Sequence, residues 1–111
     1  MVLSDEVRYR ILKLLEENPR LSQRELAREL GMSLGRANYC LRSLIGKGWI
    51  KVANFKNSRN KAAYMYLLTP RGIQRKAEVT LRFLQRKTRE YEELRAEIER
   101  VRADAERLQQ R

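Results

Sequence analysis

The chain has 111 residues, with 25 Lys or Arg, 14 Asp or Glu and no His, so its formal net charge is +11. This length holds one domain with a modest core, or a small domain with an extension, and it excludes large enzyme folds such as the TIM barrel. Hydrophobic residues make up 42% and charged residues 35%, which is typical of a folded chain with one highly charged segment. The strongly basic balance favours polyanionic partners.

The cysteine content and the first residues bear on the compartment. Cys40 is the only cysteine and can form neither an internal disulfide nor a thiolate metal cage, so the sequence predicts a reducing compartment. Residues 1–6 show no basic segment followed by an apolar one, and no apolar run is long enough to span a bilayer. We therefore expect a cytoplasmic protein without a membrane partner.

The basic charge is concentrated in the middle of the chain. Ten Lys or Arg lie in residues 30–77, and no acid occurs between Glu29 and Glu78. Because a carboxylate would repel phosphate, its absence over 48 residues indicates a surface that faces a nucleic-acid backbone. The alternative is a basic surface that serves only solubility.

Two helices are predicted in the first 31 residues. The first begins after Ser4 and ends at Asn18, because Pro19 disfavours helical backbone in the residue before it. Residues 22–25 (Ser-Gln-Arg-Glu) form a capping box that starts the second helix, and Gly31 ends it as a left-handed C-cap. The first helix has an apolar face of Val7, Ile11, Leu14 and Leu15.

A third helix is predicted over residues 34–45, with Ser33 as its N-cap. Two short helices joined by a tight Gly-containing turn are typical of a helix-turn-helix. Ala37, Leu41 and Leu44 share the apolar face, flanked by Cys40, which we interpret as a core residue rather than a redox sensor. The opposite face carries Gly35, Tyr39 and Arg42, with Arg36 and Asn38 at its sides.

This outer face has the chemistry of a recognition helix. It has cationic and hydrogen-bonding groups and no carboxylate, so it suits the major groove of DNA. There Arg reads guanine and Asn reads adenine, each through two hydrogen bonds. Gly35 allows close approach to a phosphate. An ordinary surface helix is the alternative.

A β-hairpin is predicted after the third helix. Residues 49–55 and 63–68 alternate and are rich in β-prone side chains, and a polar, basic tip at residues 56–61 separates them. Two strands with a basic tip form a wing, in which Arg59 is placed to probe the minor groove and Lys56 and Lys61 to contact phosphate. Alternatively, the tip is polar because loops are exposed. Tyr64 and Tyr66 are interpreted as packing residues rather than base-stacking ones.

Together these segments resemble the winged helix-turn-helix of the MarR family of bacterial transcriptional regulators. The resemblance rests on residues 21–31, on Leu44, on residues 48–50 and on residues 68–72 (Leu-Thr-Pro-Arg-Gly), which are similar to the family's Leu-Thr-x-x-Gly signature. Residues 57–59 (Asn-Ser-Arg) are similar to the family's wing motif Asp-x-Arg, with Asn in place of Asp, and imply the minor-groove role for Arg59.

The chain also resembles a short subgroup of MarR-family regulators associated with extracellular polysaccharide (EPS). Residues 38–41, the wing at residues 54–61 and the long C-terminal helix extend this resemblance over nearly the whole chain. It implies a bacterial, nucleoid-associated regulator of exopolysaccharide genes.

The C-terminal segment predicts a dimerisation helix. Residues 73–111 contain no Gly or Pro, and their apolar residues recur at coiled-coil spacing, with Thr80 and Lys87 as interruptions. The predicted seam residues are Leu84, Tyr91, Leu94, Ile98, Val101, Ala105 and Leu108. A helix that folds back on its own head is the alternative, and we expect Val79, Leu81 and Phe83 to pack locally.

The flanking charges of this helix favour a parallel pair. Glu90 and Glu97 fall at g positions and Arg95 and Arg102 at e positions, so a parallel pair joins opposite charges across the seam. Each exposed pair contributes only a few tenths of a kcal/mol. Two heads on a two-fold axis read an inverted repeat.

The sequence thus predicts a mainly α, α+β winged helix: a DNA-binding domain at residues 1–72 and a coiled-coil helix at 73–111. The expected function is that of a homodimeric, double-stranded-DNA-binding regulator, most simply a repressor, and not an enzyme. No cofactor or metal is expected, and a small-molecule effector stays open. The predicted DNA contacts are Ser22, Gln23, Ser33, Leu34, Gly35, Arg36, Asn38, Tyr39, Arg42, Lys56, Asn57, Ser58, Arg59, Asn60 and Lys61. The alternatives are an RNA-binding winged helix and a protein-interaction adaptor.

Overall fold

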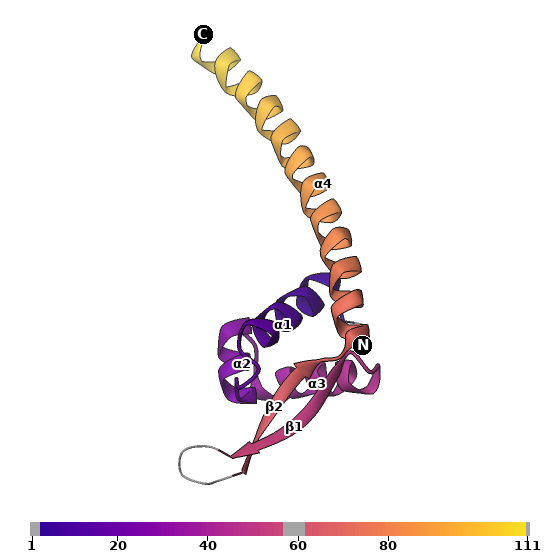
Figure 1. The fold of residues 1–111 in the computed structure, drawn as a ribbon. Helices are drawn as coiled ribbons and strands as arrows, with labels where there is room; N and C mark the ends of the chain where they lie inside the picture. Colours follow the sequence, from indigo (N-terminus) through magenta and orange to yellow (C-terminus); the bar gives the residue numbers. More distant parts are fainter. Residues whose placement is uncertain (1–2, 57–61, 111) are drawn as a thin grey trace.

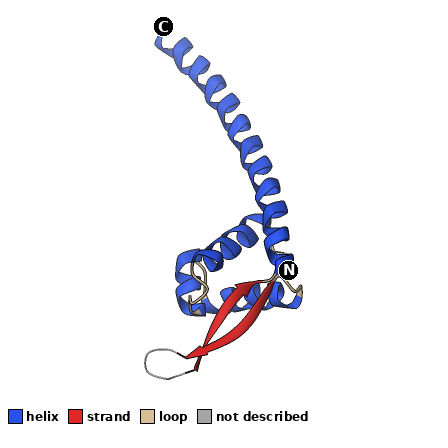
Figure 2. Ribbon diagram, viewed as in Figure 1, coloured by secondary structure: helices blue, strands red, loops and turns tan. Residues whose placement is uncertain are grey.

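The computed structural model describes residues 3–56 and 62–110. Three helices and a two-stranded antiparallel sheet form a head, and a long fourth helix leaves it as a rod (Figure 1). The elements are α1 (Asp5–Glu17), α2 (Gln23–Leu30), α3 (Leu34–Gly46), β1 (Ile50–Lys56), β2 (Ala62–Leu68) and α4 (Pro70–Gln109). Helices dominate the chain (Figure 2), which confirms the predicted mainly α winged helix.

The predicted caps define where the short helices begin and end. The Ser22 hydroxyl accepts a hydrogen bond from the Glu25 backbone N–H at 3.1 Å, and the Glu25 carboxylate accepts from the Ser22 N–H at 3.4 Å, which confirms the capping box. The Ser33 hydroxyl accepts from the N–H of Arg36 at 3.1 Å. Gly31 adopts φ 67°, so its left-handed conformation ends α2.

The predicted boundaries differ from the observed ones by one to three residues. The third helix ends at Gly46 rather than at residue 45. The first strand begins one residue later than predicted, at Ile50, and the second begins one residue earlier, at Ala62. The largest difference is at α4, which begins at Pro70 rather than at Ile73, because Thr69 caps it and proline is well tolerated in the first turn. The domain boundary after residue 72 stays a prediction, since α4 runs through it.

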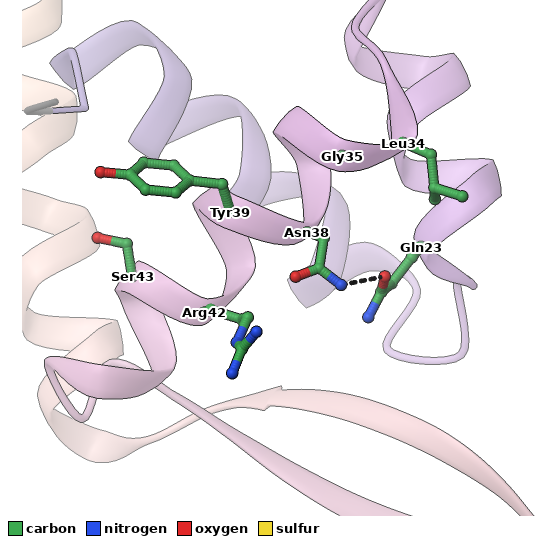
Figure 3. A pocket seen from close by; sticks show the side chains of 7 residues that line it. All are labelled: Gln23, Leu34, Gly35, Asn38, Tyr39, Arg42 and Ser43. Atoms are coloured by element: carbon green, nitrogen blue, oxygen red, sulfur yellow. Dashed lines mark hydrogen bonds between the residues drawn. The ribbon is translucent and has the colours of Figure 1, made fainter.

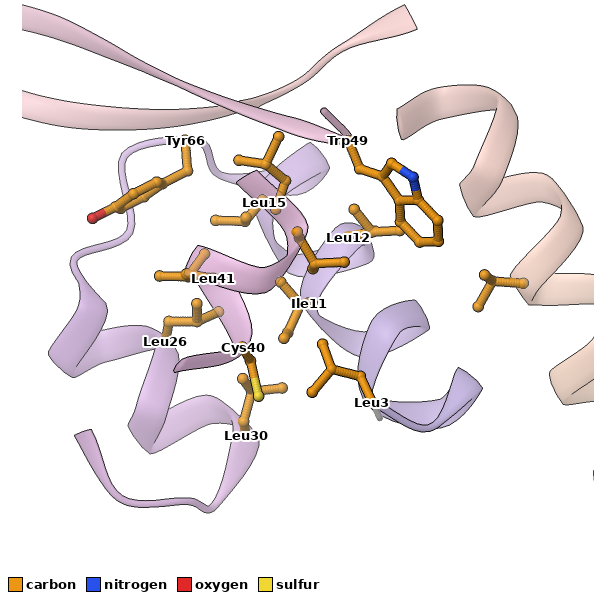
Figure 4. Close-up of a cluster of buried hydrophobic side chains, with 13 residues drawn as sticks. Leu3, Ile11, Leu12, Leu15, Leu26, Leu30, Cys40, Leu41, Trp49 and Tyr66 are labelled. Carbon is orange, nitrogen blue, oxygen red and sulfur yellow. The ribbon is translucent and has the colours of Figure 1, made fainter. Parts of the chain in front are cut away.

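The core of the head is apolar and draws on all three short helices (Figure 4). Ile11 and Leu15 of α1 lie on the face that the sequence predicts, and Leu12, which that face omits, is also fully buried. Burying one such side chain contributes about 1.5–3 kcal/mol. From α2, α3 and the strand region, the buried residues include Leu26, Leu30, Ala37, Cys40, Leu41, Leu44, Trp49, Ile50 and Tyr66.

Residues 68–72 join the hairpin to the rod. The Thr69 N–H donates to the carbonyl of Trp49 at 3.0 Å, and the Thr69 hydroxyl donates to the carbonyl of Gly48 at 2.5 Å. The same hydroxyl accepts from the N–H of Gly72 at 3.0 Å and so caps α4. A Cβ on Gly72 would lie 2.0 Å from the Trp49 carbonyl oxygen, so only glycine fits. These contacts explain the Thr and the Gly of the Leu-Thr-x-x-Gly pattern.

The first turns of α4 pack against α1. Val79 is fully buried in the core, and the rings of Phe83 and Tyr9 lie 5.2 Å apart. These contacts match the local packing predicted for Val79 and Phe83. The prediction for Leu81 is wrong: its side chain is 62% exposed, because it lies on a different side of α4 from the one that Val79 presents to α1.

Ion pairs reinforce this contact. Arg82 donates two hydrogen bonds to the Asp5 carboxylate, at 3.0 and 3.2 Å, and Lys76 pairs with Glu16 at 2.8 Å. The hydrogen bonds from Arg82 lower the pKa of Asp5 despite the desolvation that opposes them. The junction between head and rod is therefore both packed and charged.

Beyond the junction, α4 extends away from the head (Figure 1). Its 40 residues span about 60 Å at a helical rise of 1.5 Å per residue. The radius of gyration is 20.1 Å, against about 13 Å for a compact domain of this size. Within the described ranges, no helix has the length and apolar character needed to cross a membrane.

Replacing Asp5 by Asn should lower the free energy of unfolding by about 0.2–1 kcal/mol at pH 7, since the partly exposed pair with Arg82 is lost. The folded-state pKa of Asp5 is depressed, so its contribution is present above the ordinary Asp pKa and is lost as the pH falls through the folded pKa. Denaturant unfolding over a series of pH values from 7 downward measures the difference between the variant and the wild type, which should shrink as the pH falls through the folded-state pKa of Asp5. Glu93→Gln is the control, because it removes an exposed acid of α4 that has no ion pair within the described residues, and an equal effect of both variants at pH 7 would contradict the assignment.

Candidate nucleic-acid interface

The outward face of α3 lines an open hollow of about 760 Å³ (Figure 3). Burial of Ala37, Leu41 and Leu44 on the opposite face fixes this orientation. The structure therefore brings together most of the residues predicted on the third helix. The lining residues are Gln23 of α2 and Leu34, Gly35, Asn38, Tyr39, Arg42 and Ser43 of α3.

Arginines supply the charge of this face. Arg42 lines the hollow and Arg36 is exposed beside it, outside the lining. Neither guanidinium has a hydrogen bond or an ion pair with any residue in the described part of the chain. Since residues 30–77 contain no carboxylate, their charge is not neutralised locally. The face can bind phosphates or the acceptor edge of guanine.

Asn38 is less free than the sequence indicates. Its side chain is half-buried, and its Nδ2 donates a hydrogen bond of 2.9 Å to Oε1 of Gln23 (Figure 3). Gln23 in turn donates from Nε2 to the hydroxyl of Tyr66 at 3.1 Å. Asn38 of α3, Gln23 of α2 and Tyr66 of β2 are thus linked in a row by two hydrogen bonds.

Gly35 stands in the first turn of α3, on the exposed face. A Cβ at this position would meet no atom of the described neighbours within 4 Å, so packing inside the protein does not require glycine here. Because glycine is a poor helix former, the open backbone at Gly35 fits a surface that another molecule approaches closely.

The predicted caps Ser22 and Ser33 lie at the starts of α2 and α3, next to the hollow. Their hydroxyl oxygens accept backbone hydrogen bonds, and each hydroxyl keeps its proton for donation to a phosphate. Leu34 is 43% exposed and offers an apolar contact. Ser43 lies on the same face but is missing from the predicted set, although its position four residues after Tyr39 could have identified it.

The wing lies beside α3 at its other edge. Lys56 is the last residue of β1 and pairs with Ala62, so the predicted hairpin is present. The predicted contacts Asn57, Ser58, Arg59, Asn60 and Lys61 lie outside the described residues. A second groove, of about 280 Å³, runs between α3 and the strands and is lined in part by Arg42, Val52 and Tyr64.

Two further features bear on chemistry other than nucleic-acid binding. Cys40 is buried among core residues, and burial raises the pKa of its thiol, which disfavours the reactive thiolate. Across residues 3–56 and 62–110, no group of three or more His, Cys, Asp or Glu side chains could hold a metal ion.

The predicted seam residues form an unpartnered apolar row along α4. In a single chain, Leu84, Tyr91, Leu94, Val101 and Leu108 are 55–67% exposed. Ile98 is 47% exposed, and Ala105 is exposed too.

Residues 4–51 match the family of winged helix-turn-helix DNA-binding domains. Among solved structures, the chain is similar to a PadR-like transcriptional regulator from Bacillus cereus, with 17% identity and a TM-score of 0.66 over 74% of this chain and 84% of the other. No curated protein sequence matches the chain.

Two further structures of transcriptional regulators are also similar. One is the transcriptional regulator BldR from Sulfolobus solfataricus, with 25% identity and a TM-score of 0.59 over 75% of this chain and 59% of the other. The second is a MarR/EmrR family regulator from Acinetobacter sp. ADP1, with 24% identity and a TM-score of 0.56 over 76% and 57%. The chain thus spans somewhat less than three fifths of the length of these two proteins.

The family match and the exposed cationic face of α3 together identify residues 4–51 as a winged helix-turn-helix domain of the DNA-binding type. The similarity to a MarR/EmrR family regulator confirms the predicted resemblance as a likeness of fold. All three of these structures are of transcriptional regulators. The narrower resemblance to the EPS-associated subgroup stays a prediction.

Substituting Gly35 by Ala should have opposite effects on folding and binding. We expect the free protein to gain up to about 1 kcal/mol of stability, because alanine is the better helix former and its Cβ meets open space. We expect its affinity for duplex DNA to fall, because the methyl group separates the helix from the backbone that approaches it. Thermal unfolding and fluorescence anisotropy measure the two effects.

Gly46→Ala is the matched control, since Gly46 is also helical with open space around its Cβ position but lies at the far end of α3. The Gly46→Ala variant should bind duplex DNA with the affinity of the wild type. Unchanged DNA affinity in Gly35→Ala would contradict a close approach at this residue.

Proposed function

We propose that the chain acts as a homodimer that binds double-stranded DNA sequence-specifically and regulates transcription, most simply as a repressor that occludes a promoter. The observation that carries this proposal is the face of α3, which is cationic, exposed and free of carboxylates. In this account the helix at residues 34–45 enters the major groove, with Arg36, Asn38 and Arg42 at the base edges. The wing tip at residues 56–61 lies at the minor groove.

The phosphate contacts follow from the surroundings of α3. Ser22, Gln23 and Ser33 lie at the starts of α2 and α3, where backbone N–H groups and the helix dipole attract anions. Leu34 and Tyr39, exposed by 43% and 46%, are suited to pack against sugars or the thymine methyl group. These groups position the protein, and the base contacts supply specificity.

Dimerisation through α4 is supported by two separate sides of this helix. Val79 and Phe83 pack against the head, whereas Leu84, on the predicted seam, is 61% exposed. The seam continues through Ile98 to Leu108, beyond any part of the head. An apolar row of this length needs a partner, and a second copy of the chain offers the same row.

The charges beside the seam favour a parallel pair. Within the described residues of a single chain, neither Arg95 nor Glu97 forms an ion pair. In a parallel dimer Glu97 faces Arg102 of the second copy, and Arg95 faces Glu90 of that copy. Two heads held in this way read an inverted repeat with half-sites about 34–36 Å apart or at a multiple of that distance.

The resemblance to EPS-associated regulators suggests exopolysaccharide genes as targets, in the bacterial cytoplasm at the nucleoid. The adaptor alternative is disfavoured, because it requires an apolar patch on α3 where Gly35, Arg36 and Arg42 stand. An RNA-binding role draws on the exposed aromatic rings of Tyr39 and Tyr64. Stronger binding to RNA than to duplex DNA at matched salt would favour it.

Changing Arg42 to Ala should weaken binding to a selected duplex by about 1–3 kcal/mol, the value of one good base contact, and relax the preference at that base pair. The duplex comes from selection out of a random pool by the wild-type chain. Arg89→Ala removes the same charge from an exposed position on α4 and should leave the preference unchanged. Equal effects of the two variants would mean that Arg42 contributes only bulk charge.

Placing an acid in the seam tests dimerisation. Ile98→Asp should give monomers in sedimentation equilibrium, because it puts a charge at the centre of the apolar row, and its operator affinity should fall with it. The matched control is Ala96→Asp, which adds the same acid on the outer side of α4 and should remain a dimer. A dimeric Ile98→Asp variant would refute the predicted seam.

A further inference from the structure

Two hydrogen bonds link side chains of β2, α2 and α3 in a row, and the fold of a helix-turn-helix alone does not explain this row. Its three side chains come from three elements: Tyr66 from the wing, Gln23 from the first turn of α2 and Asn38 from α3. Gln23 and Asn38 line both the hollow on α3 and the groove beside the wing. The three hydrogen-bonded side chains therefore lie where the recognition helix and the wing meet.

Tyr66 is the buried end of this row of hydrogen bonds. Its residue is only 7% exposed, and its ring belongs to the hydrophobic core. Its backbone N–H donates to the carbonyl of Pro19 at 3.0 Å, in the turn that precedes α2. Since both the ring and the backbone of Tyr66 are held, its hydroxyl occupies a fixed place from which the Gln23 amide can be oriented.

The other end of this row, toward the surface, is the amide of Asn38. Its Nδ2 carries two N–H groups, and Gln23 takes one of them on the side away from Oδ1 (Figure 3). The Oδ1 acceptor and the remaining N–H stay available on the same edge of the amide. This pair is the one that reads adenine, through its N6 amino group and N7. A side chain already held in this orientation loses less conformational entropy when it binds.

We propose that Tyr66, through Gln23, is a positioning residue that presents the amide edge of Asn38 to one base pair. The inference deepens the proposed function and rests on it, because it requires α3 to face the bases. It gives the wing a role beyond its own DNA contacts: strand β2 sets the specificity of the neighbouring helix. Tyr66 itself does not touch DNA.

Tyr66→Phe tests this role, because it removes the hydroxyl and keeps the ring in the core. The probes are a duplex selected from a random pool by the wild-type chain and the three duplexes that differ from it at the base pair where Asn38→Ala loses preference. We expect Tyr66→Phe to reduce discrimination at that base pair about three- to ten-fold, the value of one hydrogen bond. Affinity for an unrelated duplex should not change.

The control is Tyr9→Phe, which removes the hydroxyl of a half-buried tyrosine on α1, away from α3. Its discrimination should equal that of the wild type. Thermal unfolding of each variant shows whether the head stays folded, so that a general loss of structure is distinguished from a change in base preference.

A double-mutant cycle distinguishes the inference from the proposed function. If Tyr66 acts through Asn38, then Tyr66→Phe has no further effect on discrimination in the Asn38→Ala background. Additive effects, or unchanged discrimination in Tyr66→Phe alone, would overturn the positioning role while Asn38 remains a reading residue. If Asn38→Ala loses no preference at any base pair, or if selection yields no preferred sequence, the proposed function fails first.

Discussion

Burial of one side of α3 determines the chemistry of the other. Ala37, Leu41 and Leu44 are fully buried, the two leucines in a core that they share with residues of α1 and α2, and rotating the helix to hide its arginines would expose these side chains to water at a cost of several kcal/mol. The cationic face with Arg42 and the open backbone at Gly35 must therefore point outward. The helix-turn-helix, the wing and the capping residues all act by holding α3 in this orientation.

In the rod, as in α3, one side of the helix is packed and another side is exposed. Val79 and Phe83 pack α4 against the head, with the ion pair between Arg82 and Asp5 beside them, and the predicted seam side stays exposed. Because the junction is packed and charged, two rods that pair would hold two heads at a defined separation. A two-fold axis along the rods would then match a two-fold axis in an inverted repeat.

Much of this arrangement could be predicted from the sequence because local rules suffice for it. The caps at Ser22, Ser33 and Gly31 act within three or four residues, and the periodicity of α3 and α4 identifies their buried sides. The engagement of Asn38 could not be predicted, because its partners are 15 residues away on α2 and, through Gln23, a further 43 residues along on β2. The sequence predicts local packing for Leu81, and only the orientation of α4 against α1 shows that this side chain is exposed.

The most direct test of the outward cationic face is amide chemical-shift mapping of the isotopically labelled full chain, titrated with a duplex that it selects from a random pool. An outward cationic face predicts that the largest shifts fall on α3, at Gly35, Asn38, Tyr39 and Arg42, and on the first turn of α2, and that they shrink as salt is raised. Shifts confined to α1 or to the far half of α4, with α3 unchanged, would contradict it.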